Sequence, residues 1–346
     1  MFFELHEEQR TLQQVARGLF DDLDALGRLR ERWPASAVDP GVWRKLVDHG
    51  LVAIGLPEDQ GGSGGDEVDA AVVCEEAGYA VVPEPLVATV GVVVPVLRDQ
   101  SGAAQRDRWL GPLVDGEITV ATAVDGTGRI VDPTGTDGAS ADAVLVVQDG
   151  AVHLVPGEAV EQRRRAAHDP SRPVVDLVGC RTDGTTLLPG ADPASVQARA
   201  RTARAAALVG VSQRMLDTTV AHARSRTQFG VPIGSFQAVQ HQLADVLLAV
   251  EQARVAVWYA ALRLRDDEDD ALRAARIAKL VANQASQLAD RVALQVHGGI
   301  GFTWEHDLHL LCKRAATWRA IDGESRVLRR GVADDVTGPA TMRSAT

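Results

Sequence analysis

The first third of the chain has the residue spacing of amphipathic helices. Between residues 7 and 110, apolar residues recur every three or four positions, which is typical of a helix that buries one face. A Gly-Leu-Pro segment at 55–57 and a glycine-rich run at 61–65 interrupt the pattern before a further helix predicted at about 68–80. The apolar positions are Leu12, Val15, Ala16, Leu19 and Phe20, followed by Trp43, Leu46 and Val47.

The pattern changes twice more along the chain. Short β-branched runs at 118–124, 143–147, 152–155 and 174–178 alternate with Gly, Asp and Pro, which is typical of strands. From Val196 onward the helical spacing returns, and it is clearest between Val239 and Val257. We therefore predict a mainly α-helical chain with a small central β domain. Its expected parts are helices at 1–110, the β domain at 111–193, a helical bundle at 194–336 and a flexible tail at 337–346.

Composition and charge exclude several classes of protein. The 346 residues carry a net charge of -11, which disfavours binding to nucleic acid. The longest nearly apolar run, 86–97, is well short of the ~20 residues that cross a membrane, so no membrane insertion is expected. The acidic start lacks the pattern of a signal peptide. Three scattered cysteines (Cys74, Cys180 and Cys312) suggest neither disulfides nor a CxxC metal pair, so we expect a cytoplasmic location.

Several conspicuous groups have ordinary explanations. The run 61–65 lacks the Lys-Ser/Thr of a phosphate loop, which favours a plain turn. His306 and His309 are three residues apart instead of four, so we expect a solvated or interface helix and no metal site. Arg201 and Arg204 allow a site for coenzyme A or an acidic neighbour, but a solvated helix face is the favoured interpretation.

Two segments suggest a ligand. Residues 224–237 (RSRTQFGVPIGSFQ) end an arginine-bearing helix in a glycine turn, and a new helix starts near Gln237. Residues 295–302 (QVHGGIGF) form a glycine-rich helix break that lets the backbone approach a ligand closely. An arginine near exposed amides suits a diphosphate group, and a glycine break suits a bulky cofactor.

In this order the two segments resemble those of the acyl-CoA dehydrogenase family. Its members pair an Arg-x-x-Phe-Gly-x-x-Ile...Gln segment with a Gln-x-x-Gly-Gly-x-Gly segment about seventy residues later, as this chain does from Arg226 and from Gln295. Residues 50–62 are similar to the family's Gly-Leu...Pro-Glu-x-x-Gly-Gly turn, and 210–217 to the first helix of its C-terminal bundle. The resemblance covers nearly the whole chain.

The resemblance implies a fold, a cofactor and a reaction. The fold would have a helical N-domain, a β-barrel-like middle domain and a C-terminal four-helix bundle, with FAD bound at a subunit interface. Arg226 would bind the flavin diphosphate of a neighbouring subunit. Phe229 and Gln237 would line the adenine side, and the segment from Gln295 through Gly298 and Gly299 would contact the diphosphate. A carboxylate would take the α-proton of an acyl-CoA while the β-hydrogen leaves as hydride, giving the 2-enoyl-CoA.

By the same resemblance, the catalytic carboxylate falls on Asp322. Asp is one methylene shorter than the family's Glu, and a displacement of about 1 Å can lower a rate on the order of 100-fold. Glu324 is the second candidate for the base. Alternatively, Asp322 caps the N-terminus of the last helix.

A further departure raises the question of a partner chain. Where the family has Thr-Glu-Pro-x-x-Gly-Ser-Asp near the flavin ring, residues 121–128 have ATAVDGTG. The β domain is also short, and 301–310 resembles the smaller subunits of heteromeric acyl-CoA dehydrogenases that degrade steroids and bulky acids. Expected partners are an acyl-CoA substrate, like or unlike chains in a tetramer, and an electron-transfer flavoprotein.

Three functions stay open at this stage. The chain is an FAD-dependent acyl-CoA dehydrogenase or a subunit of one, with Asp322 as base. Alternatively, it is a non-catalytic subunit that completes a partner's flavin site through Arg226 and Gln295. The third alternative is another flavin enzyme on the same fold, such as an oxidase. Pocket shape decides which acyl group fits, and no motif encodes it.

Overall fold

The N-terminal part is an assembly of helices, as its spacing predicts. The computed structural model describes residues 4–33, 39–131, 141–165, 168–172 and 174–338. Asp66 caps α4, accepting hydrogen bonds from the backbone N–H groups of Val68 and Asp69. The helices of this part are α1 (Glu7–Asp22), α2 (Ala25–Arg32), α3 (Pro40–Asp48), η1 (Glu58–Gln60), α4 (Glu67–Ala80), α5 (Leu86–Ala88), η2 (Thr89–Val93), α6 (Val94–Gln100) and α7 (Ala103–Val114).

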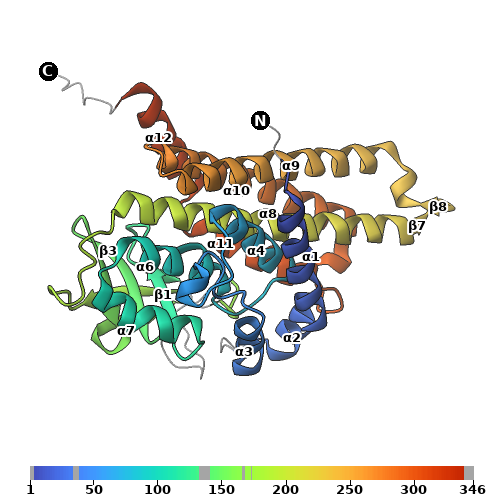
Figure 1. Ribbon diagram of the computed structural model, residues 1–346. Coiled ribbons are helices and arrows are strands. Elements are labelled where there is room, and N and C mark those ends of the chain that lie inside the picture. Colours follow the sequence, from blue (N-terminus) through green and yellow to red (C-terminus); the bar gives the residue numbers. More distant parts are fainter. Residues whose placement is uncertain (1–3, 34–38, 132–140, 166–167, 173, 339–346) are drawn as a thin grey trace, which may run out of the picture.

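The glycine-rich run before α4 is a turn, so that prediction is confirmed. Gly61, Gly64 and Gly65 all have positive φ, between 76° and 95°, a backbone conformation that glycine adopts without steric penalty. The turn delivers the chain to α4, which is buried on nearly all sides. A helix that is apolar all round belongs in a core, and α4 lies between α1 and α8 (Figure 1).

The middle of the chain forms one six-stranded sheet in the order β4-β3-β1-β2-β6-β5. Strands β1 and β3 are parallel, with Val120 opposite Ala143, and the other neighbours are antiparallel. Within the described residues, β4 and β5 are the edges of the sheet, which is open instead of closed into a barrel. The strands are β1 (Val120–Ala123), β2 (Arg129–Val131), β3 (Ala143–Gln148), β4 (Ala151–Pro156), β5 (Val160–Arg164) and β6 (Val174–Cys180), with η3 (Gly157–Ala159) between β4 and β5.

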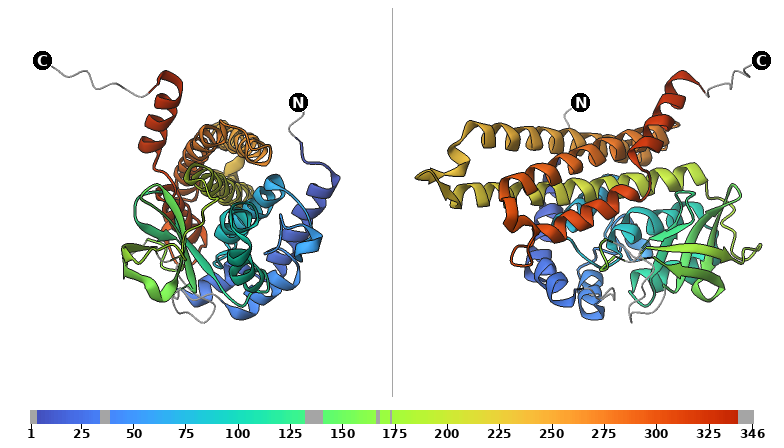
Figure 2. Two further views of the ribbon diagram at one scale, coloured as in Figure 1. Left: turned by 60° about the vertical axis from the view of Figure 1, so that its left-hand side comes forward. Right: turned by 180° about the vertical axis from the view of Figure 1, so that it is seen from behind.

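The last part is a bundle built around one long helix, α8, of 33 residues. Figures 1 and 2 show α8, α9 and α10 running side by side, with a small hairpin at one end and α12 near the other. The predicted mainly α-helical fold with a small β part is confirmed. The elements are α8 (Pro193–Ser225), β7 (Thr227–Gln228), β8 (Val231–Pro232), η4 (Ile233–Ser235), α9 (Gln237–Arg265), α10 (Ala271–His297), η5 (Gly298–Phe302), α11 (Leu308–Ala320) and α12 (Ser325–Thr337).

The structure bears on two further predictions, that of a flexible C-terminal tail and that of no membrane insertion. Most of the predicted tail, from residue 339 to 346, lies outside the described residues, and α12 reaches Thr337. Among the helices that the structure describes, none is both long and apolar enough to span a membrane.

Helix α8 touches its neighbours through very small residues. A Cβ atom built on Gly210 would overlap the backbone carbonyl oxygen of Glu75 in α4, and one built on Gly78 would overlap that of Ala207. The backbones of α4 and α8 are therefore in direct contact. This close approach places the side chains of α8 deep in the core, and twenty of them are buried.

We predict that Gly210→Ala lowers the free energy of unfolding by about 1–3 kcal/mol, because the added methyl group has no room. Gly18→Ala in α1 is the matched control. No atom lies within 4 Å of a Cβ built there, so the same change should stabilise the helix by up to ~1 kcal/mol. Urea unfolding followed by circular dichroism measures both. Equal effects of the two substitutions would contradict the close contact.

Candidate functional site

The segment 224–237 forms a sharp reversal at the end of the bundle. Helix α8 ends at Ser225, and the hairpin β7–β8 turns through Phe229 and Gly230, whose φ angles are 53° and 80°. Two successive positive φ values are typical of a type I′ hairpin turn. The chain then returns along α8, because Gly234 lies against Ala223, and α9 starts at Gln237.

The second glycine segment meets the first through three histidines. Helix α10 ends at His297, whose ring stacks on that of His222 in α8 with 4.2 Å between centroids. The ring of His306 lies 4.6 Å from that of His297. Burial lowers the pKa of His297 to about 4, so the ring is neutral at pH 7 and the stacked rings do not repel each other. The structure thus brings both predicted segments together at one end of the bundle.

The predicted cofactor-binding residues at this end are exposed. Phe229 is 94% exposed, and Arg226, Gln237, Gln295, Gly298 and Gly299 are all exposed as well. No acceptor among the described residues takes a hydrogen bond from the Arg226 guanidinium. A Cβ built on Gly298 or Gly299 would meet no atom within 4 Å.

This set of groups fits part of FAD. A guanidinium group without a partner suits a diphosphate, and an exposed aromatic ring suits an adenine. Because every one of these groups faces outward, the surface is suited to a cofactor that is held between two chains.

Asp322 lies elsewhere, in the link between α11 and α12. It is only 3% exposed, and its φ of 57° places it in the left-handed region. Its Oδ2 accepts a hydrogen bond from Nε of Arg204 in α8, 3.2 Å away. The residue at the N-cap of α12 is Glu324, so the interpretation of Asp322 as that cap is wrong. Glu324, the second candidate for the base, is exposed.

The surroundings of Asp322 are a closed cluster of charges. Burial raises the pKa of Asp322, while the Arg204 guanidinium and the Lys279 ammonium oppose the rise. Lys279 is fully buried, and burial lowers its pKa to about 7. It donates hydrogen bonds to Asn283 Oδ1 at 2.8 Å and to the carbonyl oxygen of Trp318 at 3.1 Å. Asp322 is therefore hydrogen-bonded to Arg204 of α8 and attracted by the charge of Lys279 in α10.

The two predicted places are far apart. Arg204, which holds Asp322, and Arg226 are 22 residues apart (226 minus 204) on and just beyond the uninterrupted helix α8. At 1.5 Å per residue this corresponds to about 33 Å. Asp322 and Arg226 of one chain therefore cannot touch the same flavin ring and diphosphate.

The structure overturns two other expectations. Arg201 and Arg204 do not lie on a solvated face, since they are 8% and 2% exposed. The reason is the central place of α8, which α4, α9, α10 and α11 surround. His309 is also buried, with its ring 4.4 Å from that of Trp304, so of the two expected settings, a solvated or an interface helix, the solvated one is excluded for this residue. Within the described residues, no group of three His, Cys, Asp or Glu side chains is arranged to hold a metal.

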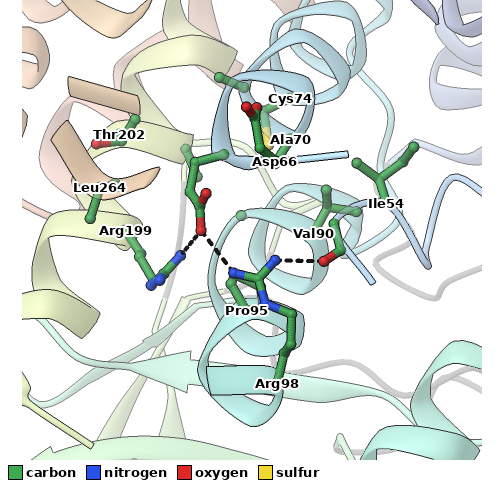
Figure 3. A pocket seen from close by; sticks show the side chains of 15 residues that line it. Ile54, Asp66, Ala70, Cys74, Val90, Pro95, Arg98, Arg199, Thr202 and Leu264 are labelled. Atoms are coloured by element: carbon green, nitrogen blue, oxygen red, sulfur yellow. Dashed lines mark hydrogen bonds and ion pairs between the residues drawn. The ribbon is translucent and has the colours of Figure 1, made fainter. Parts of the chain in front are cut away.

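A small pocket between α4, η2, α6 and α8 escaped the sequence analysis. Glu67 bridges two arginines there, accepting hydrogen bonds from Arg98 at 2.9 Å and Arg199 at 2.8 Å (Figure 3). Burial raises the pKa of Glu67, but the guanidinium groups of Arg199 and Arg98 outweigh this effect and lower it below its usual range. Arginines spaced along an alanine-rich helix were the available signal, but they also occur on solvated helices. Other lining residues are Ile54, Cys74, Val90, Gly91, Thr202 and Leu264.

Comparison with known proteins identifies relatives along the whole chain. Residues 6–117 match the family described as "Acyl-CoA dehydrogenase, N-terminal domain", and residues 196–337 match "Acyl-CoA dehydrogenase, C-terminal domain". The chain is similar to acyl-CoA dehydrogenase IpdE2 of Mycobacterium tuberculosis, at 34% identity over 84% of this chain and 86% of that protein. It is 38% identical to acyl-CoA dehydrogenase FadE34 of the same organism over 84% of this chain, but that match spans only 41% of FadE34.

Among solved structures, the chain is similar to one from the ChsE4-ChsE5 complex of Mycobacterium tuberculosis. The TM-score is 0.87 at 25% identity, and the match covers 98% of this chain and 99% of the other.

We predict that Glu67→Gln lowers the free energy of unfolding by about 1–3 kcal/mol at pH 7, because Arg98 and Arg199 lose one of the two carboxylates that they share and keep only that of Asp99. The folded-state pKa of Glu67 is lowered, so its stabilisation is complete above about pH 5 and is lost as the pH falls through that folded value.

Urea unfolding at several pH values should thus show a difference between wild type and Glu67→Gln that narrows on acidification. Glu58→Gln, at an exposed position of η1, is the control and should stay within about 0.5 kcal/mol of wild type. A difference that is constant between pH 7 and pH 3 would contradict the assignment.

Proposed function

The chain belongs to the acyl-CoA dehydrogenase family, and from this premise we propose that it is the subunit of a heteromeric enzyme that completes the flavin site of a partner chain. Its family consists of FAD-dependent oxidoreductases acting on CH–CH groups, so the chain is such an enzyme or a subunit of one. Bound FAD accepts the β-hydrogen of the acyl-CoA as hydride in this reaction. The proposal concerns what the residues of this chain contribute.

The observation that carries the proposal is the contrast between the surroundings of Arg204, inside α8, and of Arg226, just beyond its C-terminus. A general base has to come within hydrogen-bond reach of the proton that it removes. Asp322 is only 3% exposed and Arg204 already binds its Oδ2, so its carboxylate is not within such reach of a second molecule. The exposed Arg226 end is free to act on a second molecule.

Each exposed residue near Arg226 has a proposed role in binding the FAD of a partner chain. The Arg226 guanidinium binds the diphosphate of a partner's FAD through charge-assisted hydrogen bonds. Phe229 and Gln237 line the adenine side, and Gln295, Gly298 and Gly299 lie along the diphosphate. The stacked rings of His222 and His297 hold the two segments at a fixed distance from each other.

The relatives are consistent with such a partnership. The similar chain of known structure comes from a complex of two named components, ChsE4 and ChsE5. Residues 121–128, which depart from the family's flavin-ring motif, also favour a partner that supplies what this chain lacks. We propose a cytoplasmic heterotetramer that oxidises a bulky acyl-CoA of the steroid-acid kind and passes its electrons to an electron-transfer flavoprotein.

A second candidate function keeps Asp322 as the base within this chain. The burial and the raised pKa of Asp322 favour this second candidate, because a carboxylate that is hard to ionise holds a proton more strongly. In that case Arg204 would have to release Asp322 when the substrate binds. Measurements on an assembled complex separate the two candidates.

We predict that Arg226→Ala reduces the FAD content of the assembled complex roughly tenfold or more, because it removes a hydrogen bond to a charged group. Arg224→Ala, two residues earlier and equally exposed, is the control and should keep the flavin. The chain purified alone should hold little FAD and should gain it on co-expression with a dehydrogenase-like partner. Absorption of bound flavin per polypeptide measures each case.

Asp322→Asn distinguishes the second candidate. On the proposed role, the complex with this variant keeps its FAD and its turnover per flavin. If turnover per flavin falls by on the order of 100-fold or more at unchanged flavin content, Asp322 is the base and the accessory role is wrong. One FAD per chain in the protein purified alone would also contradict the accessory role.

A further inference from the structure

Two neighbouring arginines of α8 are buried with several N–H groups that have no acceptor. Arg201 is 8% exposed, and its Nε and Nη1 make no hydrogen bond. Arg204 is 2% exposed, and its Nη1 is without a partner although its Nε binds Asp322. Burying an unpaired guanidinium group is costly, and most buried polar groups in proteins have a partner. These three guanidinium nitrogens remain available to bind an acceptor from outside the chain.

Two other arginines near this pair already have carboxylate partners. Arg276 is bound to both carboxylate oxygens of Asp335, and Arg319 is bound to Asp290, so these two pairs are each neutral. The remaining cations near Arg201 are Arg204 and Lys279.

Two carboxylates, those of Asp322 and Asp125, face the two arginines. Arg204 already binds Asp322. Asp125 acts on Arg201 without a hydrogen bond between them, and its buried Oδ2 has no donor. Within the described residues, Arg201 is therefore the arginine of the pair to which no carboxylate is hydrogen-bonded.

We propose that Arg201 and Arg204 form a binding site for an oxyanion, namely a phosphate or carboxylate group. Guanidinium groups bind both through charge-assisted N–H···O bonds, and three such bonds are available here. Arg201 lies near the end of β1, since Asp125, two residues beyond that strand, is among the charges that act on it. It does not depend on the proposed accessory role, because it uses other groups than the Arg226 end of α8.

Calorimetric titration of the full chain with inorganic phosphate, at constant ionic strength set with chloride, tests the proposal. We expect saturable binding to the wild type and at least tenfold weaker binding to Arg201→Gln. Arg273→Gln is the matched control, because Arg273 lies on the surface of the same bundle, paired with Asp270. It should bind phosphate as the wild type does. No saturable binding to the wild type, or equal binding by wild type and Arg201→Gln, would overturn the proposal.

A second variant keeps the test decisive if Arg201→Gln does not fold. Asp125→Asn removes the carboxylate that competes for Arg201, so it should tighten phosphate binding severalfold. Unchanged or weaker phosphate binding by Asp125→Asn would overturn the proposal, because removing a carboxylate near Arg201 has to favour an anion bound there.

Two further probes identify the source of the anion. Acetate that displaces phosphate shows that the site accepts a carboxylate. ADP carries the adenosine diphosphate unit common to FAD and coenzyme A. If ADP displaces phosphate from the wild type and not from Arg201→Gln, the phosphate of a cofactor occupies the site. If ADP does not compete, the ligand is a free anion. Either result with ADP supports an oxyanion site at Arg201 and Arg204.

Discussion

The direct backbone contact between α4 and α8 is the constraint on which the rest of the structure depends. It requires glycine at Gly78 and Gly210, and it draws a 33-residue helix into the centre of the molecule. The stretch 198–212 of this helix has no solvated face, so each charged residue of that stretch needs a partner inside the protein. Arg199 is paired with Glu67 and Asp99, and Arg204 is paired with Asp322. The position of Asp322 is thus a consequence of how α8 packs.

Buried charges also hold the β part against the helices. Arg314 in α11 is fully buried and binds Asp169 and Ser171, from the segment between β5 and β6, as well as the carbonyl oxygens of Val81 and Val82. Such pairs add little net stability compared with an apolar contact, but removal of one partner is strongly destabilising. They therefore fix which segments lie together. The same is true of Arg129, whose bond to the carbonyl oxygen of Ala320 ties β2 to the end of α11 beside Asp322.

The sequence contains the helices and strands in a form that can be predicted, because their periods of 3.6 and 2 follow from which faces are buried. The sequence also allows the segments that contain Arg226 and Gln295 to be located, since the glycine and aromatic residues of each segment lie close together in the chain. Burial of α8 on all sides could not be predicted. Alanine alternating with arginine, as in 198–204, has the composition of a half-exposed helix, and only the packing of four other helices around it excludes solvent. For that reason the sequence predicts Arg201 and Arg204 in water, and it does not predict the buried ion pair between Asp322 and Arg204.

The length of α8 sets a condition on any assembly that this chain enters. Its Arg226 end and its Asp322 are about 33 Å apart, so a flavin that touches the first must find its catalytic base elsewhere. In an assembly of identical chains, each flavin would meet Arg226 of one copy and Asp322 of another. Every copy would then present the same carboxylate, enclosed by Arg204 and Lys279. A complex of unlike chains avoids this, because the partner can supply an accessible carboxylate together with the flavin-ring loop that residues 121–128 do not resemble. The buried ion pair at one end of α8 and the free guanidinium at the other end thus favour the same heteromeric arrangement.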